Sequence, residues 1–415
     1  MSLSSRSFHR RRLLGAFGLA GLATTGLLPA ASAQRSPFAT PTAPGGATST
    51  AAHGPLGQLL RMIPLTSVEA QSSNPLWTYV DIARQYTALG LAHSIDGPDM
   101  ENEPYLHATY AFMAASNLLL YAADEELPSL IGFHPLGLDQ ILYAGSPPNQ
   151  IQLFRAPFDA DALVATWQSA GYEERTAPTG ESIWTIGPDQ EFSPTHPIQR
   201  LLLATMNNLA LVGDVLIAAS DLATVEEVLG HLAEGGPSLL DEPITGPLVS
   251  TMPETTVSAV ALTASALGIS TFETEAIDAQ ADEIAAIRDE FGVMPAIQGM
   301  IAGVNEGAII VDSDWSPNGT PVTTPRPDAG TAYWNLNAGT PEDAEQVLAI
   351  AEARWNRLDS ITRSGPYADI MEITGTAIEG SLVEIDFRLL ISPMVWYQPI
   401  LHLDLLPIFP DDPDA

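Results

Sequence analysis

Hydrophobic residues in the middle of the chain recur at spacings that predict strands around a capped helix. The helix begins after Asp159, a typical N-cap residue, and its apolar positions include Leu163 and Trp167. Gly171 supplies the stop, because glycine readily adopts the left-handed conformation at a helix C-terminus. The strands predicted around this helix are 151–156, 182–186 and a hairpin over 209–220.

The same order of elements returns near the end of the chain. A strand over 332–337 precedes a helix that Thr340 caps and that begins at Pro341. Two strands follow, over 370–374 and 382–390. This pattern predicts an α+β fold, in which mostly antiparallel sheets are covered by helices. It also gives the hypothesis that the chain consists of two diverged strand–helix–strand–strand halves.

Two helices are predicted earlier in the chain. Asn74 and Pro75 form an N-cap followed by proline at the first helical position, and apolar residues then recur at helical spacing until Gly90. A second apolar helix is predicted over 105–123. Helices therefore come first, and the change to strands is expected near residue 150.

Composition divides the chain further. Residues 34 to about 55 are rich in Pro, Thr, Ala, Gly and Ser, and such a segment buries too little apolar surface to fold. The predicted organisation is an export signal over 1–33, a flexible linker over 34–64, a first α+β half over 65–265 and a second half over 266–415.

Residues 1–33 have the zones of an export signal peptide. The basic zone contains Arg10, Arg11 and Arg12 without any acidic residue, and a weakly apolar zone diluted by glycines follows over 13–28. An apolar zone of this length is too short and too weakly hydrophobic to be a membrane span. The three arginines therefore indicate where the protein is sent.

The end of this region is typical of a cleavage site. Ala31 and Ala33 form the small-x-small pattern that signal peptidase cuts. The consecutive arginines before two leucines resemble the twin-arginine export signal of bacteria. That resemblance implies an extracytoplasmic bacterial protein, which is extracellular, at the cell surface or in a periplasm-like space. The general secretory route and an uncleaved N-terminal anchor stay open as alternatives.

Missing residue types exclude several chemistries. The chain has 415 residues and no cysteine, and all 16 of its Lys and Arg residues are arginine. Without cysteine there is no disulfide, thiol nucleophile, zinc–thiolate site or iron–sulfur cluster on protein thiolates. Without lysine there is no Schiff base with pyridoxal phosphate and no lysine for a P-loop or kinase site.

Charge restricts the partners. The formal net charge is −34, with 50 acidic residues, and a field of that sign repels nucleic acid and anionic lipid. The apolar tail over 389–410 is interrupted by prolines and polar residues, so no transmembrane span is expected in the mature chain. The expected partner is an unknown protein, a cation or a small-molecule ligand.

Two acidic clusters are candidate calcium sites. Asp96 and Asp99 lie in the polar segment 93–107, and Asp312 and Asp314 alternate at the end of a predicted strand. Ca²⁺ takes about six to eight oxygen ligands, which carboxylates supply. The alternatives are an acidic loop between helices in the first case and a turn at a strand end in the second. No other cofactor is predicted.

No reaction motif is present. The sequence lacks Gly-x-Ser-x-Gly, His-Glu-x-x-His and a glycine-rich dinucleotide fingerprint. His134 and His196 each precede a proline and are interpreted as structural, whereas Trp315, Trp334 and Trp396 either line a groove or pack in the core. The sequence therefore favours a non-catalytic binding or surface protein over the alternative, a cofactor-free hydrolase that uses Asp/Glu or Ser/His. Whether the protein is an enzyme stays open.

Overall fold

The structure is a computed structural model in which the contacts divide the chain into residues 1–50 and 51–415. All described residues belong to the second unit. The described residues are 54–69, 76–88, 90–97, 117–122, 124–145, 149–267, 279–306, 331–360, 365–390, 396–401 and 404–409. The export-signal residues Arg10, Arg11, Arg12, Ala31 and Ala33 lie outside these ranges, so the signal remains a prediction.

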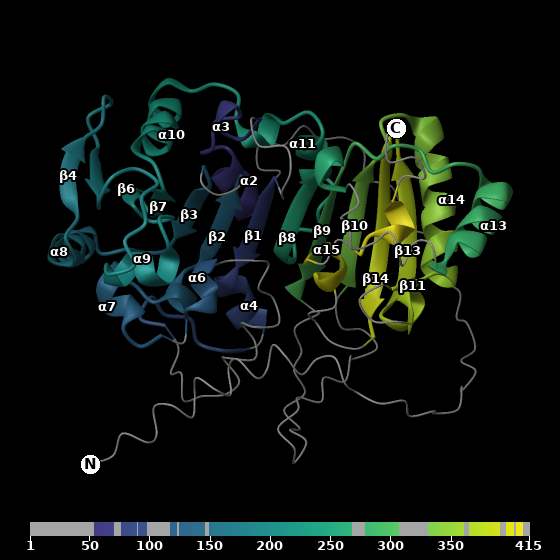
Figure 1. Ribbon diagram of the computed structural model, residues 1–415, viewed down its shortest axis with the longest axis horizontal. Helices are drawn as coiled ribbons and strands as arrows, with labels where there is room; N and C mark the ends of the chain where they lie inside the picture. The colour runs from purple at the N-terminus through teal and green to yellow at the C-terminus, as the bar shows by residue number, and fades with distance from the viewer. Residues whose placement is uncertain are drawn as a thin grey trace, which may run out of the picture. The chain divides into compact units, whose positions relative to one another are not determined.

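One antiparallel sheet of 12 strands runs through the described body, in the order β13-β14-β10-β9-β8-β1-β2-β3-β7-β6-β5-β4 (Figure 1). This sheet and its helices confirm the predicted α+β fold. The strands are β1 (Trp77–Asp81), β2 (Gln140–Ala144), β3 (Ile151–Arg155), β4 (Glu173–Thr176), β5 (Ser182–Thr185), β6 (Asn208–Val212), β7 (Val215–Ala219), β8 (Thr256–Thr263), β9 (Gly299–Asn305), β10 (Thr331–Asn337), β13 (Met371–Glu379) and β14 (Leu382–Leu389). Two short strands, β11 (Asp359–Ser360) and β12 (Gly365–Pro366), form a second sheet.

Helices contribute to a hydrophobic cluster on each face of the large sheet. The first cluster includes residues of α4 (Ile82–Ala88), α6 (Asn117–Leu120), α7 (Leu127–Ile131), α8 (Ala160–Ala170), α9 (Pro197–Leu202), α13 (Ala281–Phe291), α14 (Pro341–Arg357) and α15 (Gln398–Leu401). The second includes residues of α2 (Gly54–Leu60), α3 (Thr66–Glu69), α10 (Leu222–Glu234) and α11 (Thr245–Val249). Successive strand residues alternate between the clusters, as Tyr79 and Val80 do, so the sheet is buried on both faces.

The order of elements repeats across the sheet. Strands β1, β2 and β3, helix α8 and the hairpin β6–β7 correspond to β8, β9 and β10, helix α14 and the hairpin β13–β14. In each set the third strand pairs with the last one, and β1 pairs with β8 to join the sets. This repeat supports the hypothesis of two diverged halves. Because the second set begins with β8, we propose a boundary before Thr256 instead of the one predicted after residue 265.

The helix starts predicted from Asp159 and Thr340 are confirmed. The carboxylate of Asp159 accepts a hydrogen bond from the backbone N–H of Ala162 at 3.1 Å and begins α8. Thr340 accepts from the N–H of Asp343 at 3.1 Å and begins α14. The predicted hairpin is β6–β7, and Gly213 at its turn has φ of 63°, which glycine adopts without a steric penalty.

The helix predicted from Asn74 to Gly90 is wrong in its first part. Strand β1 occupies Trp77–Asp81, and α4 begins only at Ile82. All five residues of β1 are buried because it lies between β8 and β2 with helices on both faces. A strand buried on both faces has no alternation of polar and apolar residues, so its pattern resembles that of a helix. The helix predicted over 105–123 lies largely outside the described residues.

The C-terminal part of the linker predicted over 34–64 is folded. Gly54–Leu60 forms helix α2, and its Leu56, Leu59 and Leu60 are buried against the sheet. A linker lacks large apolar side chains, whereas these three leucines supply them. This segment therefore belongs to the folded body.

The described residues of the apolar tail pack on the body, and they include short helical turns. Trp396 is 1% exposed and belongs to the first cluster. Asp404 is fully buried, and the hydroxyl group of Ser360 donates to its Oδ2 at 2.6 Å. An Nη1 of Arg354 on α14 donates to the carbonyl oxygen of Leu406 at 3.3 Å. The tail is thus held by polar contacts as well as by its apolar residues.

Candidate functional site

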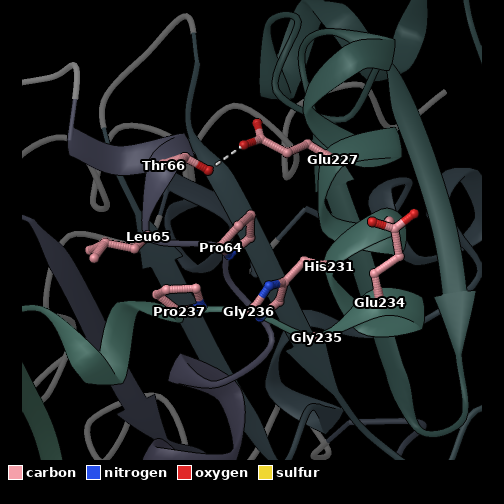
Figure 2. Close-up of a pocket in the computed structure, with 10 residues that line it drawn as sticks. Pro64, Leu65, Thr66, Glu227, His231, Glu234, Gly235, Gly236 and Pro237 are labelled. Atoms are coloured by element: carbon pink, nitrogen blue, oxygen red, sulfur yellow. Dashed lines mark hydrogen bonds between the residues drawn. The ribbon is translucent and has the colours of Figure 1, made fainter.

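A pocket of about 440 Å³ lies between α10 and the segment that leads into α3 (Figure 2). It contains two carboxylates and an imidazole beside small and apolar residues. Its lining residues are Pro64, Leu65, Thr66, Glu227, Gly230, His231, Glu234, Gly235, Gly236 and Pro237. We take this pocket as the candidate functional site.

Helix α10 is amphipathic, and its polar face borders the pocket. Asp221 caps the helix by accepting from the N–H of Thr224 at 2.9 Å. Val225, Val228 and Leu229 are buried against the sheet. With about 3.6 residues per turn, the side chains at positions 227, 230, 231 and 234 lie on the opposite side of the helix. The pocket is therefore lined by one continuous polar face of α10.

The opposite wall is held beside the end of α10 by backbone hydrogen bonds. Pro64 and Ser238 form an isolated antiparallel bridge. The N–H of Leu65 donates to the carbonyl oxygen of Pro237 at 3.1 Å, and that of Leu239 donates to Ile63 at 2.8 Å. These bonds bring together two segments that are far apart in the sequence, and their backbones form a fixed rim.

His231 has a defined tautomer in this arrangement. Its Nε2 lies 3.0 Å from the carbonyl oxygen of Arg61, and a carbonyl oxygen only accepts hydrogen bonds. Nε2 therefore carries the proton, and in the neutral ring Nδ1 is an acceptor. Nδ1 lies on the side of Gly236, 3.7 Å from the place that a Cβ would take there (Figure 2). The imidazole thus presents an acceptor to the pocket.

The two carboxylates are acceptors as well. Thr66 donates its hydroxyl proton to Oε1 of Glu227 at 2.7 Å, which ties α10 to α3 (Figure 2). Glu234 is exposed two turns further along the helix, about 10 Å away along its axis. With Nδ1 of His231 between them, these side chains give the pocket a set of acceptors that matches a ligand rich in N–H donors.

Gly230 keeps the wall of the pocket open. It lies in the middle of α10, where glycine costs about 0.5–1 kcal/mol relative to alanine. A Cβ added at this position would have no atom within 4 Å. The lack of a side chain therefore leaves a hollow between Glu227 and Glu234 instead of making room for a packed neighbour.

The carboxylates near the pocket differ in their partners. The pKa of Asp241, next to the pocket, is lowered by the backbone and side-chain hydrogen bonds from Ser238, with smaller contributions from Arg61 and His231. The N–H of Ser238 donates to Asp241 Oδ2 at 2.9 Å. No described arginine forms an ion pair with Glu227 or Glu234. These two carboxylates are the negative groups left to a ligand.

The predicted calcium residues do not form this site. Asp96 is exposed, and its backbone N–H donates to Ser94 Oγ at 3.3 Å. Asp99, Asp312 and Asp314 lie outside the described residues. Within the described ranges, no group of three His, Asp or Glu side chains is arranged to hold a metal ion. Calcium binding therefore stays a prediction for the remaining residues.

Each described histidine bonds to the backbone. Nδ1 of His134 accepts from the N–H of Leu136 at 3.1 Å, and burial lowers the pKa of this histidine. Nε2 of His196 lies 3.2 Å from the carbonyl oxygen of Ala170, and Nε2 of His93 lies 3.2 Å from that of Leu138. These contacts agree with the structural role predicted for His134 and His196.

Of the tryptophans considered for a groove, the two that the structure describes are packed in the core. Trp334 and Trp396 are each 1% exposed and belong to the first cluster. Trp334 stacks edge-on against Trp355 of α14, with ring centroids 5.1 Å apart. Trp315 lies outside the described residues. Aromatic residues therefore do not line the pocket beside α10.

A second polar group is buried at the ends of the central strands. Asp81, Gln140 and Arg155 are register neighbours on β1, β2 and β3. The hydroxyl of Tyr79 donates to Asp81 Oδ2 at 3.2 Å, and the N–H of Arg84 donates to Oδ1 at 2.9 Å. Burial raises the pKa of Asp81, against the opposing effects of Arg84, Tyr79 and Gln140. Tyr79 and Arg84 thus hold the Asp81 carboxylate in place, so we interpret this polar group as structural.

Sequence reasoning missed the pocket residues. The sequence does predict a helix after Asp221, with Leu222, Val225, Leu229 and Leu232 on one apolar stripe. Glu227, Gly230, His231 and Glu234 follow the helical spacing i, i+3, i+4 and i+7. The glycine inside a capped helix, with ionisable residues on the same face, could have indicated a binding site there. The interpretation followed the apolar stripe instead, which included Leu232, and that side chain is 37% exposed.

Comparison with known proteins gives no independent guide to this site. No protein-family model, curated protein or solved structure matches the chain. Among the described helices, none has both the length and the apolar character that crossing a membrane requires. Inference about function therefore rests on the sequence and the pocket.

Proposed function

We propose that this chain is an exported, non-catalytic protein that binds a small amine-bearing ligand in the pocket beside α10. The observation that carries the proposal is the acceptor set of the pocket, formed by Glu227, Glu234 and Nδ1 of His231. An ammonium group has three N–H donors and no acceptor, so it complements such a set. The hollow at Gly230 admits the ligand between the two carboxylates.

The charge of the whole chain supports the same ligand class. A formal net charge of −34 attracts cations from solution and increases their local concentration near acidic hollows. The chain has no lysine, so none of its own ammonium groups competes for the pocket except the chain terminus. An amine that enters from outside therefore competes with no lysine side chain of the protein.

The sequence pattern of residues 1–33 supports the proposed export. Arg10, Arg11 and Arg12 precede the apolar zone, and Ala31 and Ala33 form the cleavage pattern. A binding role is favoured over the Ser/His form of the hydrolase alternative because each of the four described histidines uses one ring nitrogen to contact a backbone group. Within the described chain, none of them is hydrogen-bonded to a serine hydroxyl, as a serine–histidine pair would require.

Thermal unfolding of the full chain tests the proposal. The probe is 1,4-diaminobutane, with NaCl at matched ionic strength and 1,4-butanediol as controls. Binding to the folded state alone raises the midpoint, and about 100-fold excess over the Kd adds about 2.7 kcal/mol to the free energy of unfolding. We expect an increase with the diamine alone. An equal increase with NaCl or with the diol would contradict the proposal.

A further inference from the structure

We propose that the outer edge of β13 accepts an extended basic segment of another protein as an additional strand of the sheet. The segment would carry arginine or lysine at alternate positions. This surface is separate from the pocket beside α10, and the inference does not depend on the function proposed for that pocket.

Strand β13 is the last strand at one end of the large sheet, where β14 is its one partner among the described strands (Figure 1). It spans nine residues, Met371–Glu379, and every side chain after Met371 is exposed or half-buried. The strand at the other end, β4, spans only four residues. A long exposed edge is a template for strand addition, in which backbone hydrogen bonds give affinity. β13 is therefore the better of the two edges.

The hairpin turn fixes which backbone groups of β13 point outward. Gly380 and Ser381 form a two-residue loop between Glu379 and Leu382, and Gly380 has φ of 62°. The residues that close such a loop form a hydrogen-bonded pair, and the pairs then alternate along the ladder. Thr376 and Ile378 therefore occupy the non-hydrogen-bonded positions, with their N–H and C=O groups directed away from β14.

Small residues on β13 give access to two carboxylates on β14. Gly375 lies opposite Asp386, and Ala377 lies opposite Glu384. A Cβ at Gly375 would lie 3.3 Å from Oδ2 of Asp386, so this carboxylate lies over β13 towards the edge. An added strand would lie about 4.8 Å beyond β13. The long stems of lysine and arginine span that distance across a glycine and an alanine.

The carboxylates on this surface lack positive partners within the described chain. None of Glu379, Glu384 and Asp386 forms an ion pair with a described arginine, whereas Glu372 pairs with Arg388. Burial raises the pKa of Glu384, and the neighbouring Asp386 and Glu379 raise it further. A basic side chain would relieve this repulsion, whereas a second copy of this acidic edge would increase it. Charge complementarity therefore selects a basic partner.

Binding of a short, end-blocked peptide of alternating lysine and valine to the full chain tests the inference. Any basic peptide is attracted to a chain of this charge, so the control is the same peptide N-methylated where its N–H groups would face β13. N-methylation keeps the charge and removes the backbone hydrogen bonds. We expect the methylated peptide to bind at least about tenfold more weakly, because several hydrogen bonds are lost.

A variant pair tests the same edge from the side of the protein. Thr376→Pro removes an outward N–H, a change that edge strands tolerate, and Thr376→Val keeps it. We expect the proline variant to weaken peptide binding by about tenfold and the valine variant to leave it unchanged. Equal affinity for both peptides, or native affinity in a folded Thr376→Pro variant, would overturn the proposal. The peptide control does not depend on any variant, so the test holds even if Thr376→Pro fails to fold.

Discussion

The imidazole Nε2 of His231 lies 3.0 Å from the carbonyl oxygen of Arg61, and this contact ties α10 to the end of α2. It orients the ring so that the other nitrogen faces the pocket. One hydrogen bond thus contributes to the fold and also fixes the chemistry of the candidate site. The contact gives the first prediction.

Replacing His231 with alanine removes this hydrogen bond and leaves the carbonyl group of Arg61 without it. We expect the free energy of unfolding to fall by about 0.5–1.5 kcal/mol, the usual net value of such a bond. Urea unfolding followed by circular dichroism measures the change. Leu232→Ala, at an exposed neighbouring position on α10, serves as the control. Equal losses in both variants would show that the bond has no specific effect.

Substitution by alanine should change the free energy of unfolding in opposite directions at Gly230 and at Gly246. Gly230→Ala enters open space within α10 and should raise the free energy of unfolding by about 0.5–1 kcal/mol. Gly246→Ala on α11 should lower it, because the added Cβ would lie 2.4 Å from the carbonyl oxygen of Leu240. Thermal melts of both variants test this contrast. A loss of stability in Gly230→Ala would mean that the hollow is occupied.

Filling that hollow should also block the ligand. Gly230→Leu places a large side chain between Glu227 and Glu234 while leucine keeps the helix favourable. We expect the midpoint shift caused by 1,4-diaminobutane to disappear in this variant and to persist in Gly230→Ala. Persistence of the shift in both variants would place the amine elsewhere on the chain.

The stability of the fold should depend on the ionisation of Asp81. Burial raises its pKa in the folded state above the unfolded value of about 3.9, so the folded chain binds the proton more tightly. The free energy of unfolding that this group contributes therefore falls as the pH rises from about 4 through the folded pKa. Asp81→Asn keeps the shape and should remove that part of the pH dependence.

The measurement for Asp81 is urea unfolding of the native chain and of Asp81→Asn at several pH values. Glu384 and Asp386 also have raised pKa values, and they contribute with the same sign to both proteins. The difference between the two curves therefore isolates Asp81. If the variant became less stable relative to the native chain as the pH rises, the assigned direction of the shift would be wrong.

The tail should be sensitive to the loss of Asp404. This carboxylate is fully buried and accepts from the hydroxyl groups of Ser360 and Tyr367. Asp404→Ala leaves buried hydroxyl groups without this partner, at about 1–3 kcal/mol. Asp289 on α13 is exposed, so Asp289→Ala is the matched control with no expected loss. Urea unfolding compares the two variants, and equal stability would show that the tail contacts do not stabilise the body.

Much of the fold was predictable from caps and periodicity. Asp159, Asp221 and Thr340 each mark the start of a helix whose apolar stripe packs on the sheet. Strands β1, β8 and β9 were not predicted, because strands buried on both faces show no alternation. The pairing of β1 with β8 joins the two halves into one sheet, and it could not be predicted from the sequence either.

The candidate site was less predictable than the fold. One wall of the pocket is the polar face of α10, and every amphipathic helix of a globular protein has such a face. The other wall, from Pro64 to Thr66, comes from far along the chain, and the bond between Thr66 and Glu227 joins residues 161 positions apart. Only the fold shows which polar face borders a hollow.

Calorimetric titration of 1,4-diaminobutane into the full chain tests the central claim most directly. The native chain is compared with two double variants that remove the same number of charges. One is Glu227→Gln with Glu234→Gln, inside the pocket, and the other is Glu226→Gln with Glu345→Gln, on α10 and α14 outside it. We predict saturable binding to the native chain and to the outer variant, and a loss of at least about tenfold in affinity in the pocket variant. Equal affinity in all three proteins would contradict an amine site beside α10.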